Sequence, residues 1–290
     1  MTEKAKALCH GAATIINAIA TGKGAAFGVD LWTKAEVRLT GEAGVVEGKI
    51  VSDPTENVIL IRKTVERVLK HFGLKESLGA EVKTWSNIPI ARGLKSSSAA
   101  ANATALATVA ALGKTLDDLA IVKLGVDAAV ESNVTVTGAF DDACGSYFGG
   151  VVITDNKKRR IIKRFEISED LTVMFHVPEV KTYTTGSNVW RMKSVAALIE
   201  KAYGEALKGN FWSALTINGL IYSSALGYNT SIALDALLAG AIAAGLSGKG
   251  PAVAAVVPNE KVDSVSVAWQ AYDGEILHAR VNHEKAKVVV

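Results

Sequence analysis

A turn and the start of a helix are encoded by Pro89-Ile90-Ala91-Arg92-Gly93-Leu94-Lys95-Ser96-Ser97-Ser98-Ala99-Ala100-Ala101-Asn102-Ala103. The alanine-rich end has high helix propensity, and Gly93 can take backbone angles closed to other residues. Ser96 to Ser98 are N-cap candidates, since a side-chain oxygen can accept an N–H of the first turn. A helix N-terminus attracts anions, and Lys95 adds a positive charge. The residues alone predict either a phosphate site or an ordinary capped, buried helix.

The usual phosphate-binding loop is excluded. That pattern requires Gly, four residues, and then Gly-Lys-Ser/Thr. Gly113-Lys114-Thr115 has the right ending, but Thr108 stands where the first Gly belongs. A nucleotide site in this chain therefore has to be built in another way.

The composition indicates a globular protein with a full core. The 290 residues suffice for one large domain or two moderate ones. Hydrophobic residues make up 49% and charged residues 21%, which excludes a disordered chain. The net charge of +3 is mild, so no nucleic-acid partner is expected. The one basic run, Lys157-Lys158-Arg159-Arg160, is interpreted as a solvated hairpin turn.

Cysteines and apolar runs indicate a cytoplasmic protein without a membrane segment. Cys9 and Cys144 form neither a disulfide framework nor a metal-binding spacing, which favours a reducing compartment. His10, Thr14 and Asn17 interrupt the apolar stretch near the N-terminus, so we interpret it as mature protein and not as a signal peptide. No run approaches the roughly eighteen apolar residues of a membrane-spanning helix.

Periodicity predicts an α+β protein with an antiparallel sheet and a domain boundary near residue 153. Besides the helix after Gly93, the expected helices cover 53–72, 116–131, 194–207, 211–226, 232–244 and 260–269. The expected strands lie in 6–39, with a glycine-rich loop over 18–28, and in 45–51, 80–85, 151–153, 161–167, 171–177, 253–257 and 274–281.

Two other stretches combine polar side chains with glycines. Asp141-Asp142 precedes Gly149-Gly150, although adjacent acids often only cap a helix. Gly245-Leu246-Ser247-Gly248-Lys249-Gly250-Pro251-Ala252 can form a backbone nest for an anion, although many tight turns look like it. Alone, neither stretch identifies a function.

Together these stretches resemble the motifs of the GHMP kinases. The second motif, Pro-x-x-x-Gly-Leu-Gly-Ser-Ser-Ala-Ala, is matched by Pro89, Gly93, Leu94, Ser96, Ser97 and Ala99-Ala100. Lys95 replaces the common Gly, and Ser98 is an extra hydroxyl. Residues 9–30 resemble the first motif, in the form of the archaeal shikimate kinases, and 245–252 resemble the third. Three motifs in the right order are far more specific than one.

The resemblance implies a two-domain fold. A ribosomal-S5-like N-terminal domain would occupy 1–153, and a ferredoxin-like α/β sandwich would occupy 154–290. ATP would be bound by Pro89, Gly93, Leu94, Lys95, Ser96, Ser97, Ser98, Ala99, Gly248, Lys249 and Gly250. By the same resemblance, Ser97 and Glu131 would hold Mg²⁺.

The resemblance also implies a catalytic carboxylate, and two residues compete for that role. Counting back from Gly149-Gly150 selects Asp142, whereas the Gly-x-x-Asp form selects Asp141. We assign the role to the pair, with either residue acting as base or as an electrostatic anchor for Lys23. The other Asp would be structural.

The implied reaction is ATP-dependent phosphorylation of shikimate, a small-molecule acceptor with a carboxylate and three hydroxyls. Lys23, Arg92, Thr184, Thr185 and Arg191 are candidates for binding it. Homoserine or mevalonate kinase is the alternative within the family. A non-catalytic nucleotide-binding regulator is the alternative outside catalysis, and a scaffold protein would bind no nucleotide. A homodimer is compatible with each of these.

Overall fold

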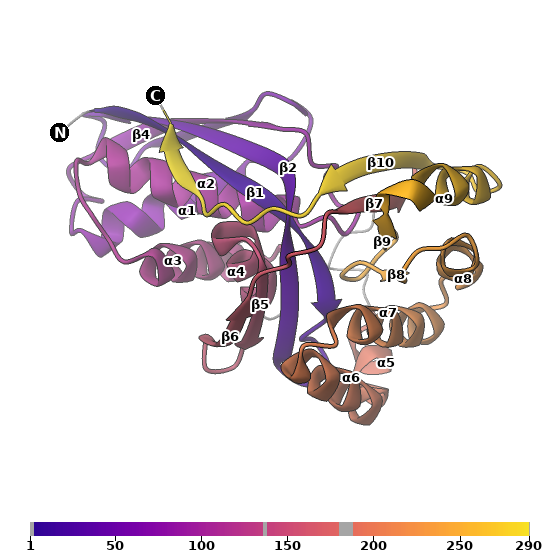
Figure 1. The fold of residues 1–290 in the computed structure, drawn as a ribbon. Helices are drawn as coiled ribbons and strands as arrows, with labels where there is room; N and C mark the ends of the chain where they lie inside the picture. The colour runs from indigo at the N-terminus through magenta and orange to yellow at the C-terminus, as the bar shows by residue number, and fades with distance from the viewer. Residues whose placement is uncertain (1–2, 136–137, 180–187, 290) are drawn as a thin grey trace.

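The computed structural model describes residues 3–135, 138–179 and 188–289 (Figure 1). Two sheets, each with helices packed against it, make up this part of the chain. Within it, no helix has the length and apolar character needed to cross a membrane.

The first sheet confirms the alternation seen in the sequence. On β2, Ala35 and Val37 are buried, whereas Lys34 and Arg38 face water. All strand pairs of the sheet are antiparallel except β3 with β4. The strands, in sheet order, are β11 (Lys287–Val289), β1 (Lys4–Ile16), β2 (Lys23–Thr40), β4 (Gly79–Ser86) and β3 (Val46–Ile50), with β5 (Val151–Asp155) on β2 and β6 (Arg160–Phe165) on β5.

Helices cover one face of the first sheet, as Figure 1 shows. They are α1 (Ile59–His71), α2 (Ser96–Ala111), α3 (Asp118–Glu131) and α4 (Phe140–Phe148). The alanine-rich α2 packs on β1 and β2, with α1, α3 and α4 around it. It is almost wholly buried because its small side chains let the neighbouring backbones approach closely. The start of α2 is therefore held rigidly at the edge of this core.

The second sheet is antiparallel, as predicted, with the order β10 (Glu275–Arg280), β7 (Leu171–Val177), β9 (Val253–Pro258) and β8 (Ala243–Leu246). Its helices are α5 (Val189–Ser194), α6 (Ala196–Lys208), α7 (Phe211–Leu226), α8 (Ser231–Leu238) and α9 (Val262–Trp269), with the short 3₁₀ turn η2 (Asn259–Lys261). Phe27 and Val29 of the first sheet share one core with Phe175 and Leu246 of the second. The two sheets are thus joined by continuous apolar packing.

The glycine-rich loop predicted over 18–28 is shorter than expected, because β2 already begins at Lys23. Gly24 and Gly28 allow close packing within the strand. A Cβ on Gly24 would lie 2.3 Å from Asp141 Oδ2, and one on Gly28 would lie 2.9 Å from Gly149 Cα. The absence of side chains at Gly24 and Gly28 therefore allows α4 and the turn after it to pack closely against β2.

Two predicted helix boundaries are wrong. The helix expected over 232–244 ends at Leu238, Gly240 follows with φ +108°, and the apolar residues after it form β8. Every residue of β8 is buried, so no alternation distinguished that strand from a helix. The helix expected from residue 53 begins at Ile59, because Asp53 Oδ1 accepts hydrogen bonds from Thr55 and closes a turn instead.

The division at residues 153/154 remains a proposal. It falls within β5, and β6 and β11, which come from the second segment, join the first sheet. The turn between β5 and β6 contains residues 157–159 of the basic run, and Arg159 pairs with Asp127 of α3.

Candidate active site

The site begins at the N-terminus of α2. Lys95 is the N-cap residue, with a left-handed backbone (φ +66°) and no side-chain capping bond. The prediction that Ser96 to Ser98 cap the helix is wrong, because the turn at Gly93 (φ +90°) and Lys95 places them in the first helical turn. The first intrahelical bond runs from the Ala99 N–H to the Lys95 carbonyl, 3.1 Å. The N–H groups of the three serines have no acceptor within the helix and suit an anion.

The loop 245–252 packs directly on this turn. Ser247 Oγ donates to the Gly93 carbonyl over 2.9 Å, and the Ala252 N–H donates to the Arg92 carbonyl over 3.1 Å. A Cβ on Gly93 would lie 2.4 Å from the Ser247 carbonyl oxygen. Only glycine fits here, since both the backbone angle and the space exclude a side chain.

The end of β1 and the turn after it complete the loop cluster. The Gly248 N–H donates to Thr14 Oγ1 over 3.0 Å, and Asn17 Nδ2 donates to the Gly248 carbonyl over 2.9 Å. Both backbone groups of Gly248 are therefore fixed by the first motif. The three glycine-containing stretches meet at one point, as the predicted common site requires.

The two acids lie in the first turn of α4, facing this cluster. Asp141 is 3% exposed, and its Oδ1 accepts a hydrogen bond from Asn156 Nδ2 over 2.8 Å. Burial, followed by the charge of Asp142, raises the pKa of Asp141 to about 7. Asp142 Oδ1 is buried and accepts no hydrogen bond from the described residues. Asp141 thus has a protein partner, whereas Asp142 Oδ1 has none among the described residues.

Two lysines complete what we term the buried charge cluster: Asp141, Asp142, Lys95 and Lys249. Lys95 Nζ lies 3.3 Å from Asp142 Oδ2, and their side chains are 7% and 15% exposed. Burial, followed by repulsion from Lys95, lowers the pKa of Lys249 to about 8. Two cations and two acids therefore share one poorly solvated space, where charges interact more strongly than in water.

A cavity of about 440 Å³ opens onto the cluster. Of the predicted nucleotide-binding residues, those lining it are Gly93, Lys95, Ser96, Ser97, Gly248, Lys249 and Gly250, together with Asp141 and Asp142. Ile50, Ile59 and Ile90 contribute apolar side chains to its lining. Leu94 and Ala99 lie behind the loop in the core, Ser98 is 8% exposed, and Pro89 is half-buried. The cavity combines an anion site with an apolar slot, the form expected for a nucleotide.

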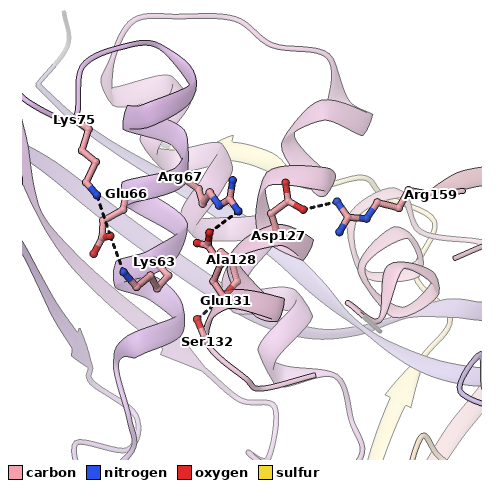
Figure 2. A network of polar contacts seen from close by, with 9 residues as sticks. All are labelled: Lys63, Glu66, Arg67, Lys75, Asp127, Ala128, Glu131, Ser132 and Arg159. Atoms are coloured by element: carbon pink, nitrogen blue, oxygen red, sulfur yellow. Dashed lines mark hydrogen bonds and ion pairs between the residues drawn. The ribbon is translucent and has the colours of Figure 1, made fainter. Parts of the chain in front are cut away.

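Lys23 and Glu131 are not brought to the cavity. Lys23 Nζ pairs with Glu200 of α6 and lies over the Tyr203 ring, 5.6 Å from its centroid. Glu131 Oε1 lies 2.5 Å from Arg67 Nη2 of α1 (Figure 2). That contact belongs to what we term the α1–α3 charge network, formed by Lys63, Glu66, Arg67, Lys75, Asp127, Glu131 and Arg159. Ser97 lines the cavity without its predicted metal-binding companion.

The acceptor candidates are also dispersed. Arg92 Nη1 donates to the Pro178 carbonyl, and Arg191 is an exposed residue of α5. Thr184 and Thr185 lie outside the described residues. Sequence reasoning missed Thr14, Asn17 and Asn156 as supporting residues. The first two interrupt an apolar strand, and that interruption was the available signal.

Comparison with known proteins supports the motifs. Residues 59–150 match the family model "GHMP kinases N terminal domain". The chain is 47% identical to a Methanosarcina mazei shikimate kinase over 288 residues, covering 99% of this chain and 97% of the relative. It is 44% identical to a shikimate kinase of Methanococcoides burtonii over 286 residues, covering 98% of each.

Solved structures agree on the fold. A homoserine kinase from Cytophaga hutchinsonii matches with a TM-score of 0.76 at 17% identity, covering 100% of this chain and 98% of the other. The Lactococcus lactis galactokinase matches with a TM-score of 0.76 at 16% identity, covering 98% and 95%. At such identities the likeness shows the two-domain fold alone, and it confirms the predicted fold class.

Proposed function

The chain belongs to the GHMP kinases, and on that basis we propose that it transfers the terminal phosphoryl group of ATP to a hydroxyl of shikimate, giving ADP and shikimate 3-phosphate. The nearly full-length similarity to relatives named shikimate kinase carries the identity of the acceptor. The chemistry is supported by the cavity, where the N-terminus of α2, two lysines and two acids converge.

The residues present fit ATP and magnesium. The first three N–H groups of α2 have no acceptor within the helix, and together with Lys95 and Lys249 they suit the phosphates. The apolar residues of the cavity lining suit the adenine base. Magnesium prefers oxygen ligands, and the Ser97 hydroxyl is one such ligand at the lining of the cavity. Bound there, the ion would neutralise phosphate charge. Glu131, the other predicted ligand, pairs with Arg67 outside the cavity lining and would reach the ion only after leaving Arg67.

The two acids are proposed to have different roles. Asp142 takes or positions the hydroxyl proton of the acceptor, because it lines the cavity and is the more exposed of the two acids. The acceptor oxygen then bonds to the γ-phosphorus while the bond to the β,γ-bridging oxygen breaks, which releases ADP. Asp141 holds the first turn of α4 through Asn156, so its role is structural.

The test is ADP release by the purified protein with Mg-ATP and a panel of acceptors: shikimate, homoserine, mevalonate and galactose. We expect turnover with shikimate alone and a phosphate monoester as product by ³¹P NMR. Turnover with another acceptor, and none with shikimate, would show that the protein is a GHMP kinase with a different substrate. Mg-ATP binding in a thermal-shift assay without turnover on any acceptor would favour a regulator.

A further inference from the structure

Lys95 departs from the common GHMP motif, and its backbone carries a cost. A non-glycine residue is strained in the left-handed region relative to the right-handed one, and Lys95 adopts φ +66° at the N-cap. Glycine would adopt the same angle without strain. The surrounding structure therefore has to offset the backbone strain at Lys95.

The surroundings are shaped to admit the Lys95 ammonium group. A Cβ on Gly248 would lie 2.4 Å from Lys95 Nζ, so the third-motif loop leaves space for this atom. Gly248 is itself fixed by Thr14 and Asn17 of the first motif. On its other side, Lys95 Nζ reaches Asp142 Oδ2 over 3.3 Å. The ammonium group thus lies close to both the third-motif loop and the first turn of α4.

Lys23 is committed to a different region of the molecule. Its ammonium group pairs with Glu200, and the two side chains are 43% and 46% exposed, against 7% for Lys95 and 15% for Asp142. An exposed pair is weak and screened by solvent, whereas a buried one is strongly coupled. The cation beside Asp142 is therefore Lys95, from the turn before α2, and not Lys23.

We propose that Lys95 is the positioning cation of the catalytic acid: it connects the phosphate-binding turn to Asp142 and orients that carboxylate toward the acceptor hydroxyl. This inference rests on the proposed function. Lys95 belongs to the turn that binds phosphate. Its side chain therefore fixes the position of Asp142, and of the acceptor hydroxyl that Asp142 binds, relative to the phosphates.

The test uses Lys95→Gly, which removes the side chain and relieves the backbone. We expect kcat to fall at least about 100-fold with a smaller change in the KM for ATP, and Lys95→Arg to recover part of the loss. Combined with Asp142→Asn, Lys95→Gly should add little, since both act on one interaction. Lys23→Met should lose less than Lys95→Gly, and the reverse order would overturn the proposal.

The split between kcat and KM separates positioning from a merely structural role. Loss of the positioning cation should lower kcat far more than it changes the KM of either substrate, whereas a structural change of the site would alter them together. Full activity of Lys95→Gly would reject the proposal. If the wild-type protein does not turn over shikimate, the proposed function fails. Unfolding of the nucleotide-free protein then remains as a test: Lys95→Gly should lower the melting temperature despite relieving the backbone, and an equal or higher value would reject the Lys95–Asp142 contact.

Discussion

The buried charge cluster and the α1–α3 charge network both join acids to bases, but their surroundings differ. In the network, Arg67 and Glu131 are 30% and 42% exposed (Figure 2). In the cluster, Lys95 and Asp142 are 7% and 15% exposed, and one oxygen of Asp142 has no partner among the described residues. Solvent screens the exposed pair of Arg67 and Glu131. Burial of Lys95 and Asp142 costs desolvation free energy, which further hydrogen bonds from a ligand would offset. The motifs select residues in both regions, Glu131 in the network and Asp142 in the cluster. The difference in burial indicates that the cluster is the functional region.

Asp142→Asn should produce the largest effect, because it removes the charge from the cluster while keeping the size of the side chain. We expect turnover to fall about 10²- to 10⁴-fold, the usual contribution of a general base, with ATP affinity nearly unchanged. Steady-state kinetics and nucleotide titration measure the two separately. The matched control is Asp127→Asn in the network, which should keep full turnover; equal turnover in both variants would remove Asp142 from the chemistry.

Gly93→Ala should have the next largest effect, on nucleotide affinity. The added Cβ would lie 2.4 Å from the Ser247 carbonyl oxygen, so the phosphate loop and the third-motif loop have to separate. We expect at least about tenfold weaker ATP binding by calorimetry.

Gly73→Ala is the control for that experiment, since Gly73 also has a positive φ (+71°) but no atom within 4 Å of an added Cβ. It should cost roughly 1–2 kcal/mol of stability through the backbone alone and leave affinity intact. If Gly93→Ala binds ATP as well as Gly73→Ala does, the loop contact has no role in the site.

Asp141→Asn should change the pH dependence of stability. The folded pKa of Asp141, about 7, lies above its ordinary value of 3.8. Between these values the folded state holds a proton that the unfolded state has lost, so stability falls as the pH rises from about 4 to 7. Asn stays neutral and can still accept from Asn156. Melting temperatures should therefore fall less steeply for the variant across this window, and parallel curves would contradict the assignment.

Glu131→Gln should have the smallest effect. An exposed ion pair contributes about 0–1 kcal/mol, and Glu131 lies with Arg67 outside the cavity lining. We expect an unfolding free energy within that range of the wild-type value and an unchanged magnesium concentration for half-maximal activity. A raised magnesium requirement would instead show that Glu131 leaves Arg67 to reach the metal.

The sequence predicted the parts of the fold that depend on local pattern. The alternation along β2 and the strand Leu171–Val177 were found from periodicity, and the family from three glycine motifs. It could not distinguish the buried strand β8 from a helix, because an apolar run has no alternation. It could not place Lys23 or Glu131 either, because the direction of a side chain depends on partners, Glu200 and Arg67, that are distant in sequence.

The pairing of β11 with β1 has a consequence for the synthesis of the protein. Lys6 lies opposite Val289, so the edge of β1 stays unpaired until almost the whole chain has been translated. At about 5–20 residues per second, that interval is roughly fifteen seconds to one minute. An unpaired strand edge can pair with the wrong strand. The N-terminal half of the nascent chain has such an edge, on β1, during this whole interval. Chaperone access during translation should therefore influence the yield of this protein more than the rate of its final folding step.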